Sequence, residues 1–116
     1  MIRVDLDEVE GRLVIDERHL HPGGYVHGGV FVAFADSVAA WGTYRNLPDG
    51  HDFTTAELKA NVFVAGPPGD VLHALGRPLH VGRRTRVREV RIRRNDDARN
   101  AAFFTCTQLV SATGPA

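Results

Sequence analysis

Asp36 is the residue of this sequence whose chemistry most needs an explanation. It stands inside an apolar run, Val30–Trp41, that has the length of a helix and no polar face. A helix that is apolar all round is normally buried, and an ionised carboxylate buried without partners is strongly unfavourable. The chain either tolerates this residue in a structural role, such as capping a loop or pairing with an arginine, or uses the carboxylate. We expect use.

A loop rich in glycine and histidine leads directly into the apolar run. It spans His21–Gly29 and ends in His27-Gly28-Gly29, which six residues separate from Asp36. Glycine permits a close approach of other groups to the backbone, and the N–H groups at a helix start attract negative charge. His19, His21 and His27 lack a Cys or carboxylate partner at the usual spacing, so no metal site is predicted.

The remaining sequence predicts one helix and six strands. The helix is expected over about residues 28–44, with Gly42 and then Asn46–Gly50 marking its end. Alternation of apolar and polar residues between turn formers is typical of strands. The strand-like segments are Ile2–Leu6, Arg12–Asp16, Thr55–Val64, Val71–Val81, Thr85–Arg93 and Ala102–Ser111.

Two local features follow from the same patterns. Glu10-Gly11 lies between the first two strand-like segments and indicates a hairpin turn. In the segment Thr85–Arg93, Val87 has one parity and Val90 and Ile92 have the other, which indicates a bulge.

This order of elements predicts an α+β fold. An antiparallel sheet of about five to six strands has to wrap around the apolar helix, because no other element could cover it. Residues 1–116 are expected to form a single domain. Long edge strands would stay open, so pairing with a second copy of the chain is expected.

Composition limits the classes of partner. The 116 residues carry a formal net charge of zero, which favours neither nucleic acid nor an acidic membrane. Most arginines lie between Arg77 and Arg99, where a local anion site is possible. The lone Cys106 indicates a reducing compartment and is interpreted as a buried strand residue. The N-terminal sequence does not resemble a signal peptide, and a cytoplasmic location is predicted.

Four segments of the sequence carry a family resemblance. They are His27–Asp36, Thr55–Lys59, Gly69-Asp70 and Gly82–Thr85. Together they resemble the hotdog-fold acyl-CoA thioesterases, and within these the phenylacetate-degradation and hydroxybenzoyl-CoA thioesterase branch. The resemblance runs from about residue 10 to about residue 111, and its strongest part is the first segment.

The resemblance implies hydrolysis of an acyl-CoA to a free acid and coenzyme A, with small aromatic acyl groups favoured. Asp36 would be the general base for a water molecule or the nucleophile that forms a mixed anhydride. The backbone N–H of Gly28 would stabilise the oxyanion that forms on the thioester carbonyl. His27 would orient the acyl oxygen or brace the loop. No metal and no cofactor is implied, since the coenzyme A thioester is the substrate.

Helix geometry adds a condition on this site. Gly28 and Asp36 are eight residues apart, which at a rise of about 1.5 Å per residue is roughly 12 Å. Both groups therefore cannot act on one carbonyl carbon within one chain. If both are catalytic, Gly28 of one subunit faces Asp36 of another across a two-fold axis. Members of the family are homodimers of this kind, and many pair their dimers into homotetramers.

The resemblance also implies a set of substrate contacts. His21 stands where the family usually has Asn or Gln against the thioester, so its role depends on an imidazole replacing an amide. Thr55 would help to place the attacking water, or is an ordinary strand residue. Arg83 and Arg84 would bind the phosphates of coenzyme A, or are only solvated. Phe34 would line the acyl pocket, or belongs to the core.

Three other functions are weighed against hydrolysis. A non-catalytic acyl-CoA-binding protein shares every feature except turnover. A hotdog dehydratase acting on acyl thioesters also uses a histidine and an acid, but in a different glycine and proline context. RNA binding is suggested only by the arginines of 83–94, which strand geometry sends to opposite faces without an aromatic stacking pair.

Overall fold

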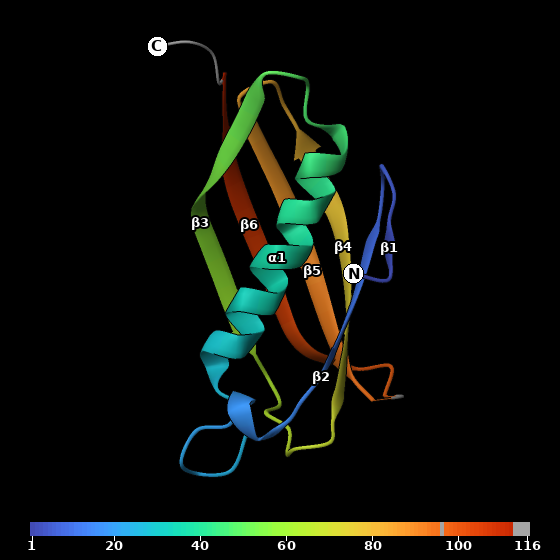
Figure 1. The fold of residues 1–116 in the computed structure, drawn as a ribbon, viewed down its shortest axis with the longest axis vertical. Helices are drawn as coiled ribbons and strands as arrows, with labels where there is room; N and C mark the ends of the chain where they lie inside the picture. Colours follow the sequence, from blue (N-terminus) through green and yellow to red (C-terminus); the bar gives the residue numbers. More distant parts are fainter. Residues whose placement is uncertain (96, 113–116) are drawn as a thin grey trace.

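The chain folds into one antiparallel sheet and one long helix (Figure 1). The computed structural model describes residues 1–95 and 97–112. The sheet order is β1-β2-β4-β5-β6-β3. The strands are β1 (Arg3–Val4), β2 (Val9–Val14), β3 (His51–Val62), β4 (Val71–Val81), β5 (Thr85–Arg94) and β6 (Asn100–Ala112), and the helices are the short 3-10 helix Glu17–His19 and α1 (Gly28–Asn46).

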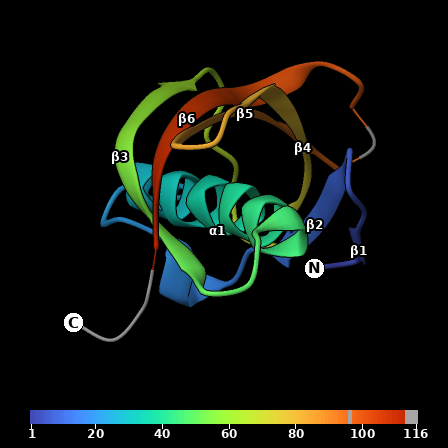
Figure 2. The ribbon, with the colours of Figure 1, turned by 90° about the horizontal axis from the view of Figure 1, so that it is seen from above.

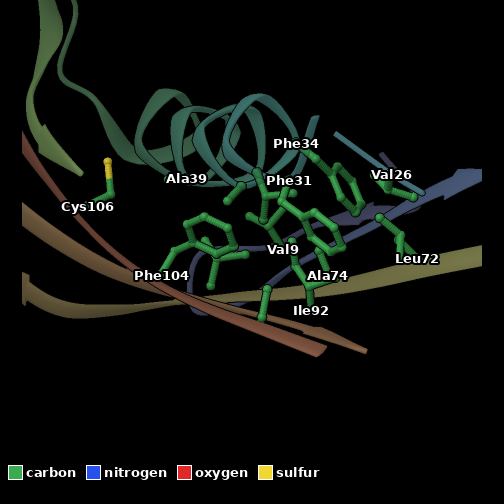
Figure 3. Close-up of a cluster of buried hydrophobic side chains, with 14 of the residues drawn as sticks. Val9, Val26, Phe31, Phe34, Ala39, Leu72, Ala74, Ile92, Phe104 and Cys106 are labelled. Carbon is green, nitrogen blue, oxygen red and sulfur yellow. The ribbon is translucent and has the colours of Figure 1, made fainter. Parts of the chain in front are cut away.

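The sheet curves around α1 (Figure 2). This agrees with the predicted antiparallel sheet that wraps around one apolar helix. The core lies between the concave face of the sheet and one side of the helix (Figure 3). Phe31, Ala35 and Val38 of α1 are fully buried there against side chains such as Val90 and Phe104. Burial of this apolar surface is the main term that holds the helix on the sheet.

One side of α1 stays uncovered within the chain. Val32 is 36% exposed, Trp41 53% and Tyr44 56%. The apolar character of this side explains why the sequence predicts complete burial, and the single subunit does not provide it. Neither α1 nor the 3-10 helix combines the length and the apolar character that a helix needs to cross a membrane.

Strand β3 is the open edge of the sheet. It pairs with β6 on one side only, and every residue except Phe53 and Leu58 is exposed. A strand of 12 residues with unpaired N–H and C=O groups along its outer edge is a template for pairing with another chain, although its pairing with β6 is irregular between Thr55 and Glu57. The uncovered side of α1 and the open edge of β3 are therefore two surfaces that a second subunit could cover.

The predicted hairpin turn at Glu10-Gly11 is wrong, because both residues lie inside β2. The turn lies earlier, where the Asp5 N–H donates to the Glu8 carbonyl at 2.8 Å. Gly11 is needed for packing: a Cβ there would lie 3.0 Å from both Phe34 and Val38 of α1. Because Gly11 has no side chain, β2 can approach the helix at this point. Gly11 does not reverse the chain.

The helix ends at Asn46, close to the predicted end at about residue 44 and at the first of the predicted turn formers, and Gly42 does not mark its end. Gly42 is buried inside the helix, over the guanidinium of Arg88 on β5. A Cβ on Gly42 would lie 2.3 Å from Arg88 Nη2. The glycine therefore makes room for a buried side chain in the middle of the helix.

Strand β5 has no bulge at Val87. Its inward positions alternate regularly through Arg86, Arg88, Val90 and Ile92, and Val87 faces the other side. The irregularity lies in the neighbouring strand β4, where the pairing shifts between Pro78 and His80 opposite Arg88 and Val87. A second shift, between Ile92 and Arg93, affects the pairing with β6. The alternation looks irregular in the sequence because Arg86 and Arg88 occupy inward positions of β5, where apolar residues are expected.

The contact between Gly42 and Arg88 predicts the effect of a small substitution. Gly42→Ala should lower the free energy of unfolding by about 1–3 kcal/mol, because the methyl group displaces a guanidinium that is almost completely buried. This loss should appear although alanine favours a helix by about 1 kcal/mol over glycine. Urea unfolding measures it.

The matched control is Gly28→Ala on the same helix, since a Cβ there meets no atom within 4 Å. That variant should unfold like the wild type. A Gly42→Ala protein as stable as the wild type or more so would contradict the close contact, and Arg88→Met should relieve most of the loss in the double variant.

Candidate functional site

Asp36 lies on the side of α1 that faces β3. It is half-buried, and its Oδ1 atom accepts a hydrogen bond from Thr55 Oγ1 of β3 at 2.9 Å. The Sγ atom of Cys106 on β6 lies 3.9 Å from the same oxygen. Two donors from two strands thus hold one oxygen of the carboxylate in place.

The second oxygen, Oδ2 of Asp36, has a different environment. No donor among residues 1–95 and 97–112 pairs with it. No ion pair to Asp36 is formed within those residues either, so the carboxylate is not neutralised by an arginine salt bridge. An oriented carboxylate with one free oxygen is suited to accept a proton or to attack an electrophile.

Cys106 belongs to the environment of Asp36. It is 1% exposed, which agrees with the buried strand residue that the sequence predicts, and it lies at one end of the core cluster (Figure 3). Burial, helped by the nearby Asp36 charge, raises the pKa of the Cys106 thiol to about 11. The thiol is therefore protonated at neutral pH and is a donor, not a nucleophile.

The start of α1 is built around His27. This residue is the N-cap, and its Nδ1 atom accepts a hydrogen bond from the Gly29 N–H at 3.0 Å. The imidazole therefore braces the helix start, and in its neutral form the proton is on Nε2, which faces away from this bond. Loop bracing, one of the two roles expected for His27, is present in the structure.

Gly28 is the first residue of α1, and its N–H has no acceptor among the described residues. Its backbone does not need the left-handed conformation, and no atom lies within 4 Å of the position of a Cβ. Neither turn geometry nor packing within the chain therefore requires glycine here. An exposed N–H at the positive end of a 19-residue helix is an anion-attracting group.

His21 repeats the geometry of His27. Its Nδ1 atom accepts from the Gly23 N–H at 2.8 Å, and its ring lies 6.3 Å from that of Tyr25. The His27 N–H donates to the His19 carbonyl, which closes the loop between the 3-10 helix and α1. His21 thus sits in the loop before α1, with Nε2 left as a possible donor.

The other residues expected to contact substrate lie elsewhere. Arg83 and Arg84 are exposed in the turn between β4 and β5, at the end of the sheet where α1 ends. Phe34 is 9% exposed and belongs to the core, on a different side of α1 from Asp36. It also lines an apolar groove of about 330 Å³ with Leu13, His19, Val30, Ala33 and Ser37. One chain therefore brings together Asp36 and Thr55, but not Gly28, Phe34 or the two arginines.

Sequence reasoning missed the polar interior beyond Asp36. Arg88, Gln108 and Thr43 are all at most 1% exposed, and Thr43 Oγ1 donates to Gln108 Oε1. The signal was the regular alternation in β5, which gives Arg86 and Arg88 the parity of the core residues Val90 and Ile92. Within the described residues, no three His, Cys, Asp or Glu side chains gather as metal ligands would.

Comparison with known proteins identifies relatives of the chain. Residues 23–101 match the family model of the thioesterase superfamily. The putative esterase ComA2 of Bacillus subtilis is 33% identical over 101 residues, which are 83% of this chain and 75% of the relative. The 1,4-dihydroxy-2-naphthoyl-CoA hydrolase of Listeria monocytogenes is 27% identical over 92 residues, 79% of this chain and 74% of the relative. The chain covers 63% of a putative esterase of Pasteurella multocida.

Solved structures have the same fold. A hypothetical thioesterase of Streptococcus pneumoniae, crystallised with coenzyme A, superposes with a TM-score of 0.88 at 25% identity, over 98% of this chain and 86% of the other. The family match covers most of the chain and includes the start of α1, Asp36 and Thr55. The chain therefore belongs to the thioesterase superfamily and has its hotdog fold.

Proposed function

We propose that this chain, acting as one domain, hydrolyses acyl-CoA thioesters to a free acid and coenzyme A. The observation that carries the proposal is the Asp36 carboxylate, which Thr55 and Cys106 hold by Oδ1 while Oδ2 stays free. The names of the relatives, which include a CoA hydrolase and putative esterases, support this reaction class.

In this proposal Asp36 acts in one of two ways. As a general base, Oδ2 takes a proton from water and the hydroxyl adds to the thioester carbon. The C–S bond then breaks, and the departing thiolate of coenzyme A takes the proton from Asp36. As a nucleophile, Oδ2 itself adds to that carbon, and the C–S bond breaks to release coenzyme A as its thiolate, which takes a proton from solvent. Water then hydrolyses the mixed anhydride to the free acid and restores the Asp36 carboxylate. In both routes negative charge develops on the carbonyl oxygen, and the free Gly28 N–H is the donor that stabilises it.

The site needs two subunits. Gly28 and Asp36 are fixed on one helix at roughly 12 Å, which is too far for both to contact one carbonyl group. The open edge of β3 and the uncovered side of α1 support a homodimer in which each helix start faces the partner's Asp36. Pairs of such dimers would give a tetramer.

A two-fold axis perpendicular to α1 has a calculable position. If Gly28 of each subunit faces Asp36 of the other, the axis passes beside the residue midway between them, which is Val32. Val32 is 36% exposed in the single chain, although it belongs to an apolar helix. The two Val32 side chains are then expected to meet at the centre of the interface.

The same two-fold axis would bring Arg83 and Arg84 of one subunit close to the site of its partner. Within one chain they lie at the end of α1, far from Gly28, but the two-fold axis reverses the second subunit. The turn that carries them then comes to the end of the sheet where the partner's helix starts. Two exposed guanidiniums there are suited to the phosphates of coenzyme A.

For the acyl group we propose a small aromatic acid, as in the phenylacetate and hydroxybenzoyl-CoA branch of the family. One relative is named for an aromatic acyl-CoA, 1,4-dihydroxy-2-naphthoyl-CoA. Tyr44 and Phe53 are in contact, with ring centroids 4.8 Å apart, on the side of α1 that faces β3. The imidazole of His21, in place of the usual amide, would donate from Nε2 to the thioester oxygen. The cytoplasm, where acyl-CoA is made, is the proposed location.

Release of thiol from a panel of aromatic and aliphatic acyl-CoAs tests the proposed reaction. Asp36→Asn should lower kcat at least a hundredfold, because the amide can neither accept the proton nor attack, while acyl-CoA still binds. Ser37→Ala, on the neighbouring exposed position of α1, is the matched control and should keep its activity. Binding without turnover in the wild type would instead indicate an acyl-CoA-binding protein, and hydration of an enoyl-CoA would indicate a dehydratase.

Substitution at the expected axis tests the dimer. Val32→Arg should separate the subunits, since two like charges would meet at the axis, and hydrolysis should fall with dissociation. Light scattering after gel filtration measures the mass, and the thiol assay measures the rate. Val14→Arg, at a 51% exposed position on β2, should leave both unchanged. A Val32→Arg protein that stays dimeric and active would place the interface elsewhere.

A further inference from the structure

Asp70 is a buried carboxylate to which the proposed reaction gives no role. It is 6% exposed and stands directly before β4. Arg94 Nε of β5 donates to its Oδ2 at 2.7 Å, and Asn95 Nδ2 donates to its Oδ1 at 3.0 Å. The bond from Arg94 lowers the pKa of the Asp70 carboxyl, so the group is ionised at neutral pH. A buried carboxylate with a donor on each oxygen is fixed in position.

The Asp70 side chain fixes the segment that follows β3. Gly66 in this segment is buried, and a Cβ on it would overlap the Asp70 carboxylate, with Asp70 Cγ only 2.9 Å away. Because Gly66 has no side chain, its backbone can pass against the carboxylate. The Gly66 carbonyl in turn accepts a hydrogen bond from the Val26 N–H at 3.0 Å. Val26 is 2% exposed and stands two residues before Gly28.

A second route leads from Asp70 to the same loop. The Asp70 carbonyl accepts from the Ile15 N–H at 2.8 Å, and Ile15, which is 1% exposed, leads into the 3-10 helix. In that helix the His19 carbonyl accepts from the His27 N–H at 2.8 Å. The two routes therefore end on the two residues that precede Gly28.

These contacts bear on the reaction because an oxyanion donor has to be held where the charge develops. The Gly28 N–H has no acceptor in the described part of the chain, so no bond of its own holds it. Its position depends on the backbone that leads to it. A shift of about 1 Å in a group of this kind can lower a rate about a hundredfold.

We propose that Asp70 is a positioning residue for the oxyanion donor and holds the Gly28 N–H in place through Gly66 and Ile15. Its effect on the rate rests on the proposed function, in which Gly28 of one subunit serves the partner's Asp36. Asp70 then belongs to the half of the site that supplies the donor, and not to the half that supplies the carboxylate.

Amide hydrogen exchange tests the positioning without a substrate. In Asp70→Ala the Val26 and His27 N–H groups should exchange roughly tenfold faster, because the loop loses its support. The N–H of Phe104, a buried residue of β6, should exchange as in the wild type. Gly66→Ala should act like Asp70→Ala, since its methyl group displaces the carboxylate. Unchanged exchange at Val26 and His27 in both variants overturns the proposal.

The thiol assay tests the consequence for hydrolysis. Asp70→Ala should lower kcat about tenfold while KM stays the same, because the donor acts on charge that develops in the transition state. Asp70→Asn keeps the side-chain shape and should recover most of the loss. Gly42→Ala is the matched control, since it also strains a buried contact, but near the other end of α1, and should keep its kcat. A folded Asp70→Ala protein with the wild-type kcat overturns the proposal.

Mixed dimers assign Asp70 to one half of the site. Refolded with Asp36→Asn chains, Asp70→Ala chains should recover about a quarter of the wild-type rate, since about half of the dimers have one intact site of two. Refolded with Gly28→Pro chains, which lack the N–H, they should not, because both variants damage the donor half. Equal rates in the two mixtures would contradict action through Gly28. If the wild type hydrolyses no acyl-CoA, the proposed function has failed, and the exchange of Val26 and His27 still decides whether Asp70 holds the loop.

Discussion

The rigidity of α1 is the constraint on which the rest of the structure depends. Gly28 begins this helix, and Asp36 lies two turns further along it. A helix cannot bend enough to bring both to one atom, because its rise of about 1.5 Å per residue is fixed by its hydrogen bonds. A chain that carries both groups on one helix can combine them only by using two copies of that helix.

Several features that look unfavourable in a single chain agree with this arrangement. The sheet ends in a long open strand, β3, and α1 exposes apolar residues on the side that leads to this strand. The Thr55–Asp36 hydrogen bond joins these two elements at 2.9 Å, which ties the geometry of the carboxylate to the edge of the sheet. A partner on that edge would cover apolar surface and complete the site in one step.

The interior under α1 has an apolar part and a polar part. The apolar part includes Phe31 and Phe104, which are fully buried. The polar part contains Arg88 and the Thr43–Gln108 pair, and Gly42 leaves room there for the guanidinium of Arg88. The chain accepts a glycine inside a helix and unpaired donors in its interior, both of which are unfavourable.

Much of this fold could be predicted from the sequence, because the pattern of apolar residues and the turn formers agree. Strand β4 has the predicted ends, and α1 begins at the predicted Gly28. The errors at Gly11 and Gly42 share one cause: a glycine that admits a neighbouring side chain looks the same in sequence as one that turns the chain. Contacts such as that of Cys106 with Asp36 join residues 70 positions apart, and no local pattern contains them.

Complementation between two inactive variants tests the shared site most directly. Gly28→Pro removes the N–H donor and suits the first position of a helix, and His27 already has the extended backbone, φ −64° and ψ 134°, that precedes proline. Gly28→Pro and Asp36→Asn chains, refolded together in equal amounts, should form about half mixed dimers, each with one intact site of two, and recover about a quarter of the wild-type rate. A mixture no more active than its parents, although mixed dimers form, would contradict a site built from both subunits.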